Sequence, residues 1–157
     1  MKTETVVNTL LKAAKDKKVE LTHLQIQKLV YFLHGYYLAK NGKPLVEEPF
    51  QAWQYGPVLT SLYESLKKYG SQSVKAYLPT IDKTTGEEKF FVVAEANEEF
   101  WRVFELVWDK YAKLSGSMLS SLSHKKGSPW DLTPNLRQVI SNAAIESYFK
   151  KEIEVAG

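Results

Sequence analysis

The sequence predicts a mainly α-helical fold: a compact bundle of about six helices with a small β-hairpin or short strands around residues 50–54 and 78–93. Two observations support this prediction. Apolar side chains recur every three or four residues over most of the chain, which is the spacing of one face of an α-helix. Capping residues and glycines stand where these patterns begin and end, and only short β-prone runs separate them. The 157 residues contain no long linker, so we expect a single domain over 1–157.

The first two helices have clear boundaries. Residues 5–17 carry apolar side chains at helical spacing. Thr22 can cap a second helix, because Gln25 follows it at the spacing of a capping box. We expect this helix to continue to about Lys40, since Gly42 favours the left-handed conformation that ends a helix and a proline follows shortly after it.

The middle of the chain combines an extended segment, a helix and a hairpin. The aromatic run at 50–55 is short and favours an extended conformation. We expect a third helix to follow, with Pro57 at its first position, where a missing N–H costs nothing, and Gly70 at its end. Thr85 and Gly86 form a turn signal between two β-prone runs, which predicts a small hairpin.

Three further helices are expected in the second half. Asn97 can cap a fourth helix, whose wide apolar stripe is typical of a central helix buried on several sides. A Ser-Gly pair interrupts it, and a short helix follows near 117–123. After a loop, Ser141 can cap the last helix.

Composition narrows the classes of function. The chain contains no cysteine, which excludes disulfides, thiolate metal sites and thiol catalysis. A net charge of +3 from scattered lysines disfavours a nucleic-acid partner, because nucleic-acid-binding proteins concentrate positive charge on one face. No apolar run is long enough to cross a bilayer, and the N-terminus is too polar for a signal peptide, so we expect a cytoplasmic protein without a membrane partner.

The residues that could carry chemistry form no recognised pattern. His23 and His34 lie roughly 16 Å apart along one expected helix, so they cannot share a metal ion. The serines around His124, with Asp131 nearby, lack the G-x-S-x-G nucleophile elbow, and no glycine-rich phosphate loop is present. We therefore predict no catalytic residue, no metal site and no cofactor. A hydrolase-like enzyme using His34 or His124, and a nucleic-acid-binding regulator, are the alternatives.

The second expected helix is unusually aromatic. Tyr31 and Tyr37 are six positions apart and point to opposite sides, so the helix is either enclosed or has an aromatic edge at the surface. Exposed Tyr and Trp residues are typical of protein-binding surfaces. Gly35 in the helix interior costs about 1 kcal/mol relative to alanine. A helix keeps such a glycine where a large ring or another backbone packs directly on it, and Trp53 and 55–57 are the candidate neighbours.

The stretch from Leu24 to Gly70 resembles the SocA-like antitoxin family, also called the Panacea domain. That family typically shows L-Q-K-L-x-Y-F-x-H-G-x-x-L-A, then G-x-P-L, then A-W-x-Y-G-P-V and a late G-x-P-W. The order and spacing of these pieces make the resemblance specific, and it covers about residues 20–150. The matching positions here are Gln27, Lys28, Leu29, Tyr31, Phe32, His34, Gly35, Leu38, Ala39, Gly42, Pro44, Leu45, Ala52, Trp53, Tyr55, Gly56, Pro57, Val58, Gly127, Pro129 and Trp130.

The resemblance implies an antitoxin of a bacterial or phage toxin–antitoxin pair. Such a protein binds and neutralises a cognate protein toxin, encoded next to it, by direct protein–protein contact. Some members of the family instead act as adaptors that present a toxin to a cytoplasmic AAA+ protease. The identity of the toxin and the oligomeric state of this chain are not specified by the sequence.

An antitoxin needs only to bind, which agrees with the lack of a catalytic pattern. We expect the partner-binding surface to include five aromatic residues, with a glycine-, proline- and histidine-containing motif shaping it from beneath. The aromatic residues are Tyr36, Tyr37, Trp53, Tyr55 and Trp130, and the motif residues are His34, Gly35, Gly56 and Pro57. Family members often carry an acidic residue shortly after the late histidine, whereas Lys125 and Lys126 follow His124 here.

Overall fold

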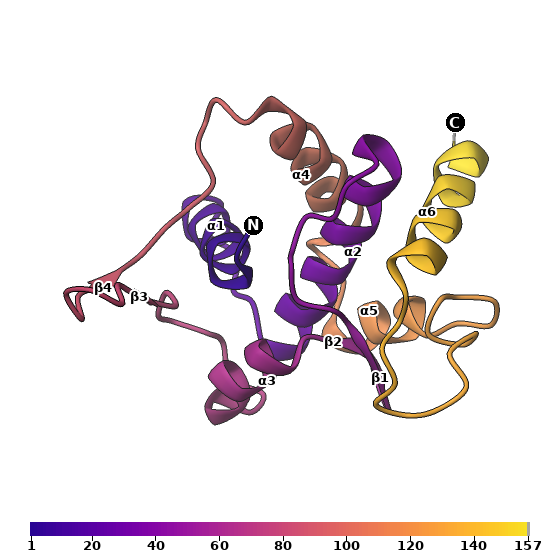
Figure 1. Ribbon diagram of the computed structural model, residues 1–157, viewed down its shortest axis with the longest axis horizontal. Coiled ribbons are helices and arrows are strands. Elements are labelled where there is room, and N and C mark those ends of the chain that lie inside the picture. Colours follow the sequence, from indigo (N-terminus) through magenta and orange to yellow (C-terminus); the bar gives the residue numbers. More distant parts are fainter. Residues whose placement is uncertain (157) are drawn as a thin grey trace.

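The computed structural model describes residues 1–156 and confirms the mainly helical fold (Figure 1). Within this range, two antiparallel sheets of two strands each accompany the helices. The helices are α1 (Thr3–Asp16), α2 (His23–Asn41), α3 (Thr60–Leu66), the 3-10 helix η1 (Lys67–Tyr69), α4 (Glu98–Tyr111), α5 (Gly116–Ser123) and α6 (Asn142–Ala156). The strands are β1 (Gln51–Trp53), β2 (Gly56–Val58), β3 (Thr80–Ile81) and β4 (Glu88–Lys89). None of these helices has both the length and the apolar character needed to cross a membrane.

Helix α2 lies at the centre of the fold, and the other helices pack around it (Figure 1). Every residue from 26 to 38 is buried, so α2 is enclosed on all sides, Tyr31 and Tyr37 included. The prediction that the helix after Asn97 is the central one is wrong. Helix α4 buries only one face against the core, and Leu106 on its outer side is 40% exposed.

The predicted helix boundaries are confirmed where short-range capping sets them. The Thr22 hydroxyl accepts a hydrogen bond from the backbone of Gln25, whose side chain accepts one from the backbone of Thr22 in return. Gly42 adopts φ 70° and ends α2. Asn97 and Ser141 each accept a backbone N–H from three residues further on. These caps satisfy N–H groups that the first turn of a helix leaves unpaired.

Pro57 is the main error in the predicted order of elements. It lies in β2, and α3 begins only at Thr60. In the β1–β2 hairpin, Ala52 stands opposite Pro57, but its N–H bonds to the carbonyl of Gln138 at 2.9 Å and its carbonyl accepts from the N–H of Arg137 at 2.6 Å. The missing N–H of Pro57 therefore leaves no strand hydrogen bond unmade, and residues 137–140 run along the free edge of β1.

The hairpin β3–β4 belongs to a segment, residues 78–93, that extends away from the helices and is called the arm below (Figure 1). Helix α1 fixes the base of the arm through buried polar side chains. The Asn8 amide donates to the Leu78 carbonyl at 2.8 Å and accepts from the Leu78 N–H at 2.7 Å. The Thr9 hydroxyl accepts from the N–H of Val93 at 2.9 Å. The predicted hairpin at 78–93 is thus confirmed, as is the extended segment that became β1.

Candidate functional site

An open groove of about 490 Å³ lies where the beginning of α2 meets the β1–β2 hairpin, α3 and the chain before α6. Two of the predicted partner-binding residues, Trp53 and Tyr55, line it. We call it the Trp53 groove. Its lining also includes His23, Leu24, Gln27, Lys28, Tyr63, Leu136 and Arg137.

The ring of Trp53 is held in place from several directions. Its indole N–H donates to the Gln51 side chain at 3.0 Å, and its ring centroid lies 4.9 Å from that of Tyr63. The guanidinium of Arg137 lies over the ring, 4.2 Å from its centroid. Trp130 is not part of the groove lining, but its indole N–H donates to the Trp53 carbonyl at 2.6 Å and so supports the hairpin. By contrast, Tyr55 at the tip of the hairpin is 64% exposed.

Tyr36 and Tyr37 do not lie at the surface. They are only 2% and 5% exposed, because α2 is enclosed along this part of its length. The Tyr36 hydroxyl lies 3.0 Å from the hydroxyl of Tyr111 in α4 and accepts a hydrogen bond from Lys110. The Tyr37 hydroxyl donates to Glu99 at 3.3 Å. The expectation that these two rings belong to an exposed surface is therefore wrong for the chain on its own.

His34 is buried and joins three parts of the chain. Its Nδ1 accepts the backbone N–H of Val46 at 3.3 Å, so a neutral ring carries its proton on Nε2, which then donates to the Asn142 side chain at 2.9 Å. Burial lowers the pKa of His34, and the hydrogen bond to Asn142 opposes that shift in part. The charge of the chain's N-terminus adds a smaller lowering effect. His34 is therefore a packed, hydrogen-bonded residue of the core.

Gly35 packs against a large ring, as its position in the helix predicts, but the ring belongs to Phe149 of α6. The predicted neighbours Trp53 and 55–57 are wrong. A Cβ atom on Gly35 would overlap the Phe149 ring. Of the four motif residues, His34 and Gly35 thus face α6, whereas Gly56 and Pro57 adjoin Lys28 in the groove lining.

Lys28 is a buried cation that the sequence analysis did not single out. It is 1% exposed, and its ammonium donates to the Pro57 carbonyl at 2.8 Å. Burial lowers the pKa of Lys28 to about 7. Gly56 has φ +114°, and a Cβ there would come within 3.2 Å of the lysine Cε and overlap the Ser123 hydroxyl. The left-handed backbone conformation and the close contact with Ser123 therefore both favour glycine at this position.

A neighbouring amide fixes the end of β2. The Gln27 side chain donates to the Leu59 carbonyl at 3.2 Å and accepts from the Leu59 N–H at 3.1 Å. Together with Lys28, it ties the chain entering α3 to α2. The signals in the sequence were the match of Gln27 and Lys28 to the family motif and their polar character inside an otherwise apolar run.

The groove is positively charged and contains no acidic side chain in its lining. Among the residues that the structure describes, no carboxylate forms an ion pair with Lys28 or Arg137. Burial lowers the pKa of His23, and the charge of Lys28 lowers it further. The site can therefore offer hydrogen-bond donors and aromatic faces to a bound group.

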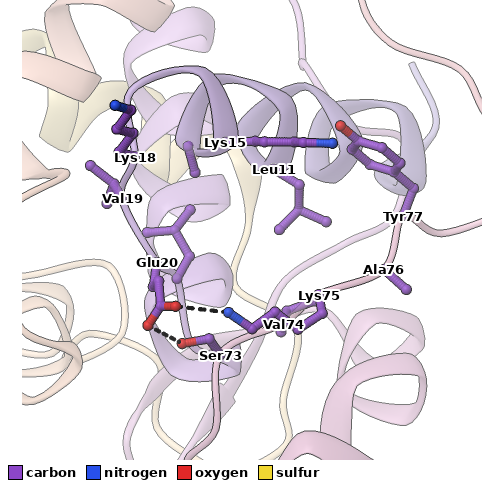
Figure 2. Close-up of a pocket in the computed structure, with 12 residues that line it drawn as sticks. Leu11, Lys15, Lys18, Val19, Glu20, Ser73, Val74, Lys75, Ala76 and Tyr77 are labelled. Carbon is purple, nitrogen blue, oxygen red and sulfur yellow. Dashed lines mark hydrogen bonds and ion pairs between the residues drawn. The ribbon is translucent and has the colours of Figure 1, made fainter.

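Two other hollows adjoin α1. One, of about 460 Å³, lies between the end of α1 and residues 73–77 (Figure 2). There Lys75 forms an ion pair of 2.8 Å with Glu20, and Ser73 donates to the same carboxylate (Figure 2). The other, of about 800 Å³, lies between α1, residues 92–95 and α4. None of the five predicted partner-binding residues lines either hollow.

The arm carries a second group of exposed apolar residues that the sequence analysis missed. They are Ile81, Phe90, Phe91 and Val92. The run of phenylalanine and valine at 90–93 was the available signal, but it predicted only a strand. The arm is thus the main competitor of the Trp53 groove as a contact surface.

Among the described residues, no hydrogen bond joins the side chains of the hydrolase alternative to one another. His34 bonds to Val46 and Asn142, whereas the Asp131 carboxylate accepts the N–H of Gly127 at 2.8 Å. The His124 ring packs against Trp130 at 5.2 Å between centroids. Within residues 1–156, no group of three or more His, Asp or Glu side chains could hold a metal ion. The described geometry therefore contains no assembled catalytic triad or metal centre.

These features define a helical domain whose most distinctive surface is an aromatic, acid-free groove beside a tight hairpin. The sequence model of the family described as "Antitoxin SocA-like, Panacea domain" matches residues 26–131. The chain is also 32% identical over 130 residues to Antitoxin SocA of Caulobacter vibrioides (strain NA1000 / CB15N), an alignment covering 83% of this chain and 69% of the relative. The chain belongs to the SocA-like antitoxin family with the Panacea domain, as its motifs predict. No solved structure matches it.

Proposed function

We propose that this protein is an antitoxin that binds a cognate protein toxin directly and neutralises it, and that the Trp53 groove is the contact surface. Membership of the antitoxin family supports a toxin as the partner. The observation that supports this particular surface is the pairing of an exposed ring, Tyr55, with a fixed ring, Trp53, at the mouth of an open groove. Rings of this kind supply much contact area with few rotatable bonds.

The position of the groove in the chain favours it over the other hollows. Trp53, Tyr55 and Lys28 all lie inside the segment 26–131 that matches the family. The hollows beside α1 are lined in part by that helix, which precedes this segment. If the family shares a binding function, we expect the residues that carry it to lie within the family segment.

The β1–β2 hairpin suits tight binding because it is already ordered. Strand pairing, the bond from Trp130 to Trp53, and the bond from Lys28 to Pro57 hold its backbone. Little conformational entropy is then lost on association. Truncation of one well-placed aromatic anchor in such a surface costs about 2 kcal/mol of binding free energy.

Co-expression tests the proposal. The gene next to this one is expressed alone and together with this chain in a cytoplasmic expression host. Under the proposal, the neighbouring product stops growth, and co-expression restores growth and yields a co-purifying complex. The amount of the toxin is unchanged in rescued cells, whereas presentation to a AAA+ protease would deplete it. A neighbouring product that is harmless and does not co-purify contradicts the proposal.

A further inference from the structure

We infer that the Trp53 groove recognises an acidic side chain, an aspartate or glutamate flanked by apolar residues, on the surface of the bound toxin. Arg137 contacts this carboxylate at the mouth of the groove, and Lys28 provides positive charge at its floor. The inference rests on the proposed function and specifies its chemistry. It is carried by the arrangement of the basic side chains in the groove.

Arg137 is fixed with its hydrogen-bonding groups available. Its guanidinium carbon lies over the Trp53 ring, 4.2 Å from the centroid, and its backbone N–H donates to the Ala52 carbonyl at 2.6 Å. Its backbone has φ 67°, which is uncommon for a residue other than glycine and costs free energy. Among the described residues, its side chain forms no hydrogen bond or ion pair. A guanidinium held over a ring by a cation–π contact keeps N–H donors that can bind a carboxylate.

Lys28 lacks a compensating charge. An ammonium has three N–H donors, and the structure gives this one a single acceptor, the Pro57 carbonyl. Without an anionic partner the protonated form of this lysine is costly to bury, which is why its pKa is lowered to about 7. A carboxylate entering the groove would reduce that cost, so binding energy is available at this position that a neutral group cannot supply.

Acidic side chains are absent from the lining of the Trp53 groove but present in the hollow shown in Figure 2. There the exposed ammonium of Lys75 is paired with Glu20 at 2.8 Å (Figure 2). In the Trp53 groove, two cations share a lining without any Asp or Glu. Charge complementarity therefore favours an acidic group of the partner as the occupant.

The rim of the groove specifies the neighbours of that acidic group. Leu24, Tyr55 and Leu136 line the groove and are exposed. Burying these exposed apolar side chains against apolar side chains of the partner removes them from water and favours association. We therefore expect apolar or aromatic residues on both sides of the recognised Asp or Glu.

A phage-displayed library of linear heptapeptides tests the inference without knowledge of the toxin. The full chain is used as the target, and selected peptides are synthesised with amidated C-termini, both as selected and with each Glu or Asp changed to Gln or Asn. Affinities are measured for the wild type and for Arg137→Gln and Lys28→Met. Lys17→Gln is the matched control, because Lys17 also lies over a tryptophan, 5.9 Å from the Trp108 centroid, but outside the groove.

The expected result is a set of peptides with an internal acidic residue between apolar ones. Neutralising that residue, or the Arg137→Gln change, should weaken binding by about tenfold or more, and Lys17→Gln should change it less than twofold. Arg137→Gln remains informative if Lys28→Met fails to fold, because Arg137 lies at the mouth. Selection of peptides without acids, unchanged affinity after neutralisation, or failure to select any peptide overturns the inference.

The same variants separate this inference from the proposed function. If acidic peptides bind as described but the neighbouring gene product is not toxic, the carboxylate-binding groove stands and the antitoxin proposal fails. If the neighbour is toxic and Arg137→Gln neutralises it as well as the wild type does, the antitoxin proposal stands and the inference fails.

Discussion

The ring of Phe149 in α6 lies directly on Gly35 in α2, where a Cβ atom would come within 2.7 Å of the ring Cζ. The same ring contacts the aromatic side chains of Tyr31, Phe32 and Tyr36. The last helix is thereby fixed to the central helix, and the chain that leads into α6 is the one that runs along β1 and supplies Arg137. The contact at Gly35 thus helps to position one side of the groove.

Replacing Gly35 with alanine should destabilise the protein. The added methyl group overlaps a buried ring, which costs about 1–3 kcal/mol and outweighs the gain in helix propensity. Urea unfolding measures the change. In a Phe149→Ala background, which already costs about 3–5 kcal/mol, the same change should be neutral or stabilising because the overlap is gone. An equal cost in both backgrounds would contradict this explanation.

His34 should make stability depend on pH in weakly acidic solution. Its pKa in the folded protein lies below its ordinary value of 6.5, so between these values the unfolded chain binds more protons. The contribution of neutral His34 to stability is therefore complete above about pH 6.5. It is lost as the pH falls toward the pKa of His34 in the folded protein. Urea midpoints from pH 5 to 7.5 measure the effect.

The His34→Leu variant supplies the control for this dependence. It should be less stable by about 1–3 kcal/mol at neutral pH, since the buried Val46 N–H loses its acceptor. Its stability should also vary less with pH than that of the wild type. Burial lowers the pKa of His23 too, so a smaller slope is expected to persist in this variant and to disappear when His23→Gln is added. If stability varied with pH equally in the wild type and in the double variant, neither histidine would be the cause of the dependence.

Lys28 should make the free energy of unfolding depend on pH in neutral to alkaline solution. Its pKa falls from 10.5 to about 7 on folding, so the unfolded chain binds more protons across this window. Stability should rise as the pH increases from about 7 toward 10, and the Lys28→Met variant should lose this rise. The test uses chemical denaturation up to pH 9, where about nine-tenths of the tyrosines in the unfolded chain are still protonated. An identical slope in the variant would show that the lysine is not buried as described.

Much of the fold follows from residues close together in the sequence, and the errors come from contacts that are distant in it. The cap at Thr22 depends on a residue three positions on, which is why the start of α2 was predicted correctly. Pro57 was misplaced because its position in β2 depends on residues 137–140, which occupy the other edge of β1. No local pattern contains that information.

The candidate site was predicted only in part for the same reason. Trp53 and Tyr55 lie on one short hairpin, so their association followed from the sequence. Tyr36 and Tyr37 were assigned to the surface because periodicity cannot show how many helices surround a given one. The buried Lys28 was missed because its acceptor, the Pro57 carbonyl, is 29 residues away.

Tyr55 should contribute to the free energy of toxin binding and little to the free energy of unfolding. Its side chain is mostly exposed, so Tyr55→Ala should change the free energy of unfolding by less than about 0.5 kcal/mol. The same change should weaken toxin binding by about 2 kcal/mol, or roughly 30-fold, which titration calorimetry can measure. Phe90→Ala on the arm is the matched control, since it also removes an exposed ring. The opposite outcome, with Phe90 critical and Tyr55 dispensable, would assign toxin binding to the arm.

Hydrogen–deuterium exchange of the purified complex tests the central claim most directly. Exchange rates of the chain alone are compared with those in complex with the product of the adjacent gene. Contact through the Trp53 groove predicts slower exchange on binding at residues 51–59 and 136–140, with the arm at 78–93 unchanged. Slower exchange confined to the arm or to α1, with the hairpin β1–β2 unaffected, would contradict it.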